Sequence, residues 1–154
     1  MFFAKAVISM HKPHKDEIWE EYRCADMPAG EPYFAEIKHD DEGTVFNLEC
    51  IDKYIVIRFN EDIRMYLYSD EGMRMASYAP IQEEQGDKYY FRGRYLFLVN
   101  NSRFLEWAME ESCGAYAEIG YKHLCIVTEN ELIDLLAASE PFIYEIPKGG
   151  QHEI

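Results

Sequence analysis

The cysteine and histidine side chains are the first residues to test for chemistry, because both types can ligate metals and transfer protons. His11 and His14 are three residues apart, a spacing that puts two side chains on one face of a helix. Pro13 stands between them and breaks that helical register. We therefore expect solvated loop histidines here and no metal site.

A second Cys–His combination, Cys113 and His123, lies in the last third of the chain. A catalytic dyad needs a cysteine whose thiol pKa is lowered. Cys113 falls at the C-terminal end of a predicted helix, where the helix dipole raises the pKa of a thiol. The sequence therefore favours a packed thiol and a histidine on a strand.

Sequence motifs for cofactor binding are absent. The chain contains no GxGxxG or GxxxxGK[ST] phosphate loop, no GxSxG nucleophile turn and no HExxH zinc pair. Its four cysteines, Cys24, Cys50, Cys113 and Cys125, form no CxxC pair and fit no zinc motif. We expect no cofactor, no metal and no disulfide, and interpret the cysteines as small buried hydrophobic residues.

Acidic residues dominate the last third of the chain. Between Phe104 and Ile146 there is one base, Lys122, against nine acids, which are Glu106, Glu110, Glu111, Glu118, Glu129, Glu131, Asp134, Glu140 and Glu145. One interpretation is a solvated helical face. The other is a docking surface for a basic partner, anchored by aromatic residues. The aromatic candidates are Trp107, Tyr116 and Tyr121.

We predict a partner-binding set within this segment, namely Glu106, Glu110, Glu111, Tyr116, Glu118, Glu129 and Asp134. The whole chain carries a formal net charge of −14, so it gains no counterion release from a nucleic-acid backbone and is repelled by anionic membranes. No stretch approaches the roughly 20 apolar residues that span a bilayer. The first five residues lack the pattern of a secretion signal. We expect a cytoplasmic protein with a basic protein partner, and neither nucleic acid nor membrane as a ligand.

Most of the elements that must position these residues are predicted to be strands. They cover residues 2–9, 33–38, 44–51, 53–59, 62–68, 73–78, 89–92, 94–99, 121–127 and 142–146. In residues 62–68, Ile63, Met65 and Leu67 alternate with other side chains, which is the period of a strand. The tight connection at Asn60 and Glu61 predicts a hairpin between strands 53–59 and 62–68.

Three segments are predicted to be helices. Residues 17–23 follow Pro13, which can open a helix. Residues 103–113 follow the capping candidates Asn101 and Ser102 and end before Gly114. Thr128 and Glu131 match a capping box, which predicts a helix over about 129–138.

Together these elements predict an α+β fold, a mainly antiparallel meandering sheet with two or three helices packed on one side or end. The length of 154 residues fits a single domain. We expect that domain to cover residues 1–147, with residues 148–154 as a flexible C-terminal tail.

Two functions of different classes fit the sequence. The first, which it favours, is a non-enzymatic acidic module that binds a basic protein, in the manner of an immunity-type inhibitor that neutralises a basic toxin or nuclease. The alternative is a small enzyme or ligand-binding domain with a site in a concavity of the sheet. A flat acidic face favours the first function, and a deep pocket that encloses Arg and His favours the second.

Overall fold

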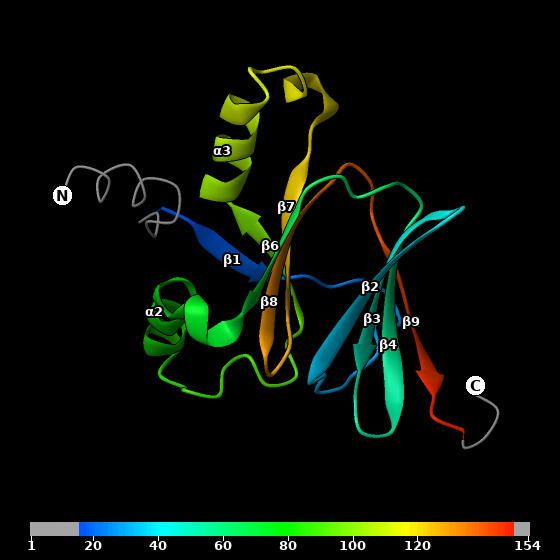
Figure 1. The fold of residues 1–154 in the computed structure, drawn as a ribbon. Coiled ribbons are helices and arrows are strands. Elements are labelled where there is room, and N and C mark those ends of the chain that lie inside the picture. The colour runs from blue at the N-terminus through cyan, green and yellow to red at the C-terminus, as the bar shows by residue number, and fades with distance from the viewer. Residues whose placement is uncertain (1–15, 150–154) are drawn as a thin grey trace.

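The computed structural model describes residues 16–149 as two antiparallel sheets and two α-helices (Figure 1). The five-stranded sheet has the order β1 (Ile18–Glu21), β6 (Leu96–Asn100), β7 (Lys122–Val127), β8 (Glu131–Ala137) and β5 (Tyr66–Asp70). The four-stranded sheet has the order β2 (Phe34–Asp40), β3 (Gly43–Glu49), β4 (Lys53–Phe59) and β9 (Phe142–Pro147). The helices are α2 (Met75–Gln85) and α3 (Arg103–Glu111), with short 3-10 turns η1 (Glu71–Met73) and η2 (Ala117–Ile119).

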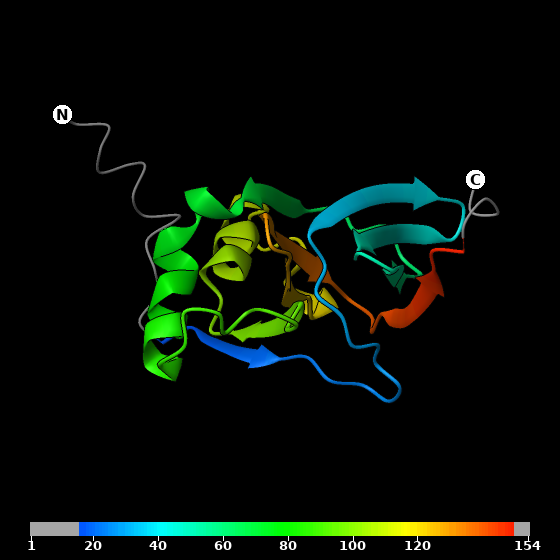
Figure 2. The ribbon, with the colours of Figure 1, turned by 90° about the horizontal axis from the view of Figure 1, so that it is seen from below.

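Both faces of the five-stranded sheet are covered. One face packs against the four-stranded sheet through buried residues that include Phe46, Ile57, Leu96, Ile126 and Ile133. Figure 2 shows α2 and α3 on the side of this sheet that faces away from the four-stranded sheet. A second apolar cluster lies on that side, and its members include Phe97, Cys125, Leu132 and the ring of Phe91. Within residues 16–149, no helix is both long enough and apolar enough to cross a bilayer.

The α+β class and the antiparallel pairing are confirmed, as are strand 53–59 and the helix that begins at Arg103. The prediction of one meandering sheet is wrong, because the strands divide between two sheets. The chain passes between these sheets three times, after β1, after β4 and after β8. The predicted strand over residues 2–9 lies outside the described residues, as do His11 and His14.

The predicted helix over 129–138 is wrong, because this segment contains strand β8. All seven residues of β8 are buried, so apolar residues occur on both of its faces and the alternation typical of a strand is missing. The Thr128–Glu131 pair exists, but it closes the β7–β8 turn. Thr128 Oγ1 donates to Glu131 Oε1 at 2.7 Å and accepts the Glu131 N–H at 2.9 Å.

The predicted helix over 17–23 is also wrong, because residues Ile18–Glu21 form edge strand β1. Exposed and half-buried residues alternate along it, and Trp19 and Glu21 face the same side as their partners Val99 and Phe97. Trp19 packs against Phe97, with ring centroids 5.8 Å apart. Pairing with β6 thus decides the conformation of a segment whose local pattern also fits a short helix.

The predicted hairpin at Asn60 and Glu61 is wrong, because β5 leaves the four-stranded sheet and pairs with β8. Buried Thr44 holds the departing chain: its N–H donates to Glu61 O, and its hydroxyl accepts the Ile63 N–H at 2.9 Å. Two further predicted strands, 73–78 and 89–92, are wrong as well. The first lies in η1 and α2, and the second is a series of turns whose aromatic rings pack on the sheet face.

The end of the described chain is attached to the four-stranded sheet. Lys148 N–H donates to Asp52 O at 3.0 Å, and Lys148 Nζ donates to Glu49 Oε2 at 2.7 Å. Residues 150–154 of the predicted tail lie outside the described residues.

Candidate partner-binding groove

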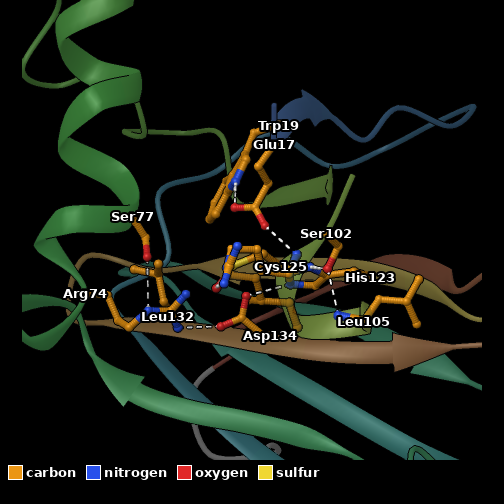
Figure 3. Close-up of polar contacts among 12 residues, drawn as sticks. Glu17, Trp19, Arg74, Ser77, Ser102, Leu105, His123, Cys125, Leu132 and Asp134 are labelled. Carbon is orange, nitrogen blue, oxygen red and sulfur yellow. Dashed lines mark hydrogen bonds and ion pairs between the residues drawn. The ribbon is translucent and has the colours of Figure 1, made fainter. Parts of the chain in front are cut away.

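A chain of polar side chains lies buried on the helix-covered face of the five-stranded sheet (Figure 3). The Ser102 hydroxyl oxygen lies 2.7 Å from His123 Nδ1, and His123 Nε2 lies 2.6 Å from Asp134 Oδ1. The second carboxylate oxygen of Asp134 accepts a hydrogen bond from Arg74, which also reaches the hydroxyl of Ser69. The side chains of His123 and Asp134 are 3% and 1% exposed, so solvent hardly reaches the middle of this chain.

The polar chain connects the beginnings of both helices to the sheet. His123 lies on β7 and Asp134 on the neighbouring β8. Ser102 is the N-cap of α3, and its oxygen accepts the Leu105 N–H at 2.9 Å. Arg74 is the residue immediately before α2. One buried carboxylate therefore fixes, directly or through His123, the start of each helix.

Asp134 is ionised in this environment. Burial raises the pKa of its carboxyl, but hydrogen bonding and charge interaction with His123 and Arg74 outweigh burial, so the pKa lies below its ordinary value. Because a carboxylate only accepts, His123 Nε2 carries a proton toward it. The neighbouring Cys125 behaves in the opposite way: burial and the charge of Asp134 raise its thiol pKa well above the ordinary value. Cys125 is therefore a protonated, buried thiol and not a nucleophile.

Serine, histidine and aspartate joined in this order are also the parts of a hydrolytic triad. Ser102 is only 8% exposed, and its oxygen already caps α3. The next amide, Arg103 N–H, donates to Glu17 Oε2 at 3.0 Å, so a carboxylate stands where an oxyanion would need donors. The adjoining surface depression adds Asp16 and Glu106. We therefore assign a structural role to this chain of polar side chains: it holds the two helices in place.

A groove of about 680 Å³ lies between the C-terminal half of α3, the start of β7 and the connection from β4 to β5. We call it the α3 groove. Its apolar lining consists of Met65, Ala108, Met109 and Leu136. Two aromatic side chains, Tyr116 and Tyr121, also line it, with ring centroids 6.4 Å apart. Flexible Met and amphipathic Tyr side chains are typical of surfaces that bind other proteins.

Carboxylates outnumber cations around the α3 groove. Its acidic lining residues are Glu61, Asp62 and Glu111. The one cation among the lining residues is Arg64, which is paired with Asp62 at 3.6 Å. Glu61 is held in place, since it accepts hydrogen bonds from the Ala138 N–H and the Ser139 hydroxyl. The groove therefore presents apolar surface beside net negative charge.

The structure places two of the seven predicted site residues, Glu111 and Tyr116, in the α3 groove. Tyr116 is 51% exposed, as a contact residue must be. Three more of the predicted acids are exposed close by in sequence, Glu106 and Glu110 on α3 and Glu118 in η2. Five predicted residues thus belong to α3 or to the segment that follows it.

The other two predicted residues lie elsewhere. Glu129 is exposed in the β7–β8 turn, at the opposite end of the five-stranded sheet from the C-terminal end of α3 (Figure 1). Asp134 is buried between the sheet and the helices and does not belong to an exposed surface. Glu131 of the acid-rich segment is buried as well. These placements follow from β8 being a strand that is covered on both faces.

The prediction from sequence missed both the polar chain and half of the groove. The sequence does contain one signal for the polar chain. Asp134 stands within the apolar run Leu132–Leu136, and a charged residue in a buried run needs a partner. Its partners, Arg74 and His123, are distant in sequence and cannot be selected by spacing. Glu61 was assigned to a hairpin turn and Asp62 to the strand after it, which gave no reason to place either residue beside α3.

No protein-family model matches this chain, and comparisons with curated proteins and with solved structures likewise find no match. The function must therefore be argued from the groove and from the side chains around it.

Proposed function

We propose that this protein is a non-enzymatic acidic module that binds a basic protein partner through the α3 groove and the exposed acids next to it. The observation that carries the proposal is the composition of the groove, which combines an apolar lining with three carboxylates and one paired cation. An immunity-type inhibitor, which covers the basic site of a toxin or nuclease, is the kind of protein that uses this combination.

The groove fits a particular kind of contact segment. An apolar side chain of the partner would enter between Met109, Leu136 and Tyr116, where burial of apolar area supplies most of the affinity. Lysine or arginine residues on either side of it would meet the carboxylates of Asp62 and Glu111. Such charge pairs mainly set the partner's orientation and the rate of encounter.

Charge beyond the groove supports the same kind of partner. Glu106, Glu110 and Glu118 are exposed, and the chain carries a net charge of −14. Long-range attraction of this sign speeds the encounter with a basic protein. It weakens as salt is added, because the screening length is only about 8 Å at physiological ionic strength.

The buried polar chain supports a binding role over an enzymatic one. Arg74 and His123 are enclosed, but both bond to Asp134 between them. Their polar atoms are therefore directed at another side chain of the protein and not at a cavity where a substrate would bind.

The test begins with capture of the partner from a native lysate on the immobilised protein, followed by association kinetics with the purified partner. Glu111→Lys reverses a charge in the groove, and we expect it to slow association about three- to tenfold at low salt. Glu129→Lys is the matched control, because it makes the same change of net charge at the far end of the sheet. We expect its effect to be clearly smaller, and the difference between the variants to shrink as salt rises.

Tyr116→Ala tests the apolar part of the groove. We expect it to raise the dissociation rate about tenfold with little change in association, which is typical of a buried aromatic anchor. Equal slowing by Glu111→Lys and Glu129→Lys, together with an unchanged dissociation rate for Tyr116→Ala, would show that net charge alone acts and that the groove is not the site.

A further inference from the structure

A second cavity, of about 470 Å³, is lined by residues of α2, of the connection between α2 and β6 and of the β7–β8 turn. We call it the turn cavity. In Figure 1 the β7–β8 turn lies at the opposite end of the five-stranded sheet from the C-terminal end of α3. The turn cavity shares no lining residue with the α3 groove, so it is a separate candidate site.

Two aromatic rings form a corner among the lining residues of the turn cavity. The rings of Tyr78 and Phe91 stand at 89° to each other, with centroids 6.3 Å apart. Val127 and Leu132 add aliphatic surface. Aromatic and aliphatic surface of this kind suits the alkyl stem of an organic cation, and a nearby aromatic ring adds attraction for its positive charge.

The protein already places its own cations on an aromatic ring at this cavity. Arg92 and Lys88 lie over the ring of Tyr89, at 4.5 Å and 5.1 Å from its centroid. Arg92 also lies 3.6 Å from the carboxylate of Glu31. The two basic lining residues are therefore engaged by the protein itself and offer little to an anionic ligand.

Two carboxylates of the turn cavity are placed differently. Glu71 lies close to Tyr78, and burial of Tyr78 together with the effect of this carboxylate raises the pKa of Tyr78 to about 12. Glu129 is exposed, lines the cavity and forms no ion pair within residues 16–149. Neither carboxylate forms an ion pair within residues 16–149, so both can meet a cation that enters beside the aromatic corner.

Backbone hydrogen bonds hold the walls of the turn cavity together. Glu71 N–H donates to Asn130 O at 2.8 Å, and Glu129 N–H donates to Pro32 O at 3.0 Å. Thr128 braces the turn through its hydrogen bond to Glu131. The cavity therefore exists before any ligand arrives, which lowers the entropic cost of binding.

From this arrangement we propose that the turn cavity binds an organic cation, with the ammonium group near Glu71 and Glu129 and an alkyl stem against Tyr78 and Phe91. The same chemistry is present in a free alkylamine and in a lysine side chain of another protein. Cadaverine represents the first source, and lysine capped as Nα-acetyl-lysine methylamide represents the second.

Amide-resolved NMR titration of the full chain with each probe tests the proposal. We expect saturable shifts at the amides of Glu71, Glu129 and Asn130, with little change around Tyr116 in the α3 groove. Glu129→Gln should weaken binding about three- to fivefold, the size typical of one solvent-accessible charge pair. Glu118→Gln removes the same charge from η2 and is the matched control, with affinity expected to stay unchanged.

Each outcome of the titration decides the proposal. Saturable shifts that depend on Glu129 and not on Glu118 support it, and the probe with the higher affinity identifies the source of the cation. Shifts that stay linear with probe concentration, or an equal loss of affinity in Glu118→Gln, show diffuse attraction to an acidic surface and overturn it. Saturable shifts that centre on Tyr116 also overturn it, because the cation then binds in the α3 groove.

Discussion

Asp134 is the residue on which the helix-covered side of the molecule depends most. It accepts hydrogen bonds from both Arg74 and His123 while almost completely buried. A buried ion pair adds little stability compared with well-packed apolar residues. Removal of one member, however, leaves the other charge without compensation in a region of low dielectric, and this second effect decides what a mutation does.

Asp134→Asn is therefore expected to lower the free energy of unfolding by about 3–5 kcal/mol, the range found when one partner of a buried pair is removed. Urea denaturation followed by tryptophan fluorescence measures this loss. Glu118→Gln, a similar change of charge at an exposed position, is the control and should stay within about 0.5 kcal/mol of wild type. Similar midpoints for the two variants would contradict the role assigned to Asp134.

The same carboxylate predicts a dependence of stability on pH. Because the pKa of Asp134 in the folded protein is lowered, its contribution is fully present above the unfolded value of about 3.9. That contribution is lost as pH falls from there through the lower folded pKa. We expect the difference in unfolding free energy between wild type and Asp134→Asn to shrink as pH falls below about 4. A difference that stays constant from pH 6 to pH 3 would show that this titration is not coupled to folding.

At the scale of elements, the β2–β3 turn is held against the end of β4 at Gly43. This glycine has φ of +145°, and a Cβ atom there would lie 2.1 Å from Phe59 O. Gly86, which ends α2, has φ of +66° and open space around it. At Gly43 a side chain would therefore both clash and require an unfavourable φ, whereas at Gly86 only the φ is unfavourable.

Gly86→Ala is expected to cost about 1–2 kcal/mol, the penalty for an L-residue in the left-handed region. Gly43→Ala adds a backbone clash to unfavourable backbone geometry and is expected to cost about 3 kcal/mol or more. Thermal unfolding of both variants compares them directly. If both melt at the same temperature, the chain relaxes around Gly43 and the close approach of β2–β3 to β4 is not a constraint.

Elements with an unambiguous local pattern are the ones that the sequence could predict. Strand 53–59 and the helix beginning at Arg103 were predicted and are present. Strand β8 was mistaken for a helix because it is buried on both faces and its first residues fit a capping box. The first residues of helix α2 were mistaken for part of a strand over 73–78. This helix has no buried residue, so its pattern carries no signal of a helical core face.

The candidate site likewise contains one part that the sequence could predict and one part that it could not. The acids of α3 were predicted because one helix carries them, and Glu111 and Tyr116 do line the groove. The opposite lining, which includes Glu61 and Asp62, could not be predicted, because it depends on the chain leaving one sheet for the other after β4. Sequence spacing contains no information about that change of partner strand.

At the scale of the whole molecule, the reactivity of the four cysteine thiols can be used to measure how often the two apolar clusters open. Cys24 and Cys113 are exposed, so the interpretation of all four cysteines as buried residues is wrong for these two. Cys50 lies in the cluster between the sheets and Cys125 in the cluster beneath the helices. Burial raises the pKa of the thiols of both Cys50 and Cys125, which slows their reaction further.

A disulfide reagent that releases a chromophore should therefore react promptly with Cys24 and Cys113. It should react with Cys50 and Cys125 only after the fold opens. We expect a rate difference of about a thousandfold or more, given ordinary stabilities of 5–15 kcal/mol. The double variant Cys24→Ser, Cys113→Ser isolates the slow pair, whose rates should rise together as urea is added. Prompt reaction of either buried thiol in this variant would place that thiol in a region that opens without global unfolding.

The three passages of the chain between the sheets have a consequence for how the protein is made. Strand β1 pairs with β6, where Ile18 stands opposite Asn100, and β4 pairs with β9, where Lys53 stands opposite Pro147. On the ribosome, strands β2, β3 and β4 emerge early and can form local hairpins, but the sheet that covers their apolar face is completed only after β8 has emerged. With synthesis at about 5–20 residues per second, the nascent chain exposes that face for several seconds, the interval in which a chaperone would be needed.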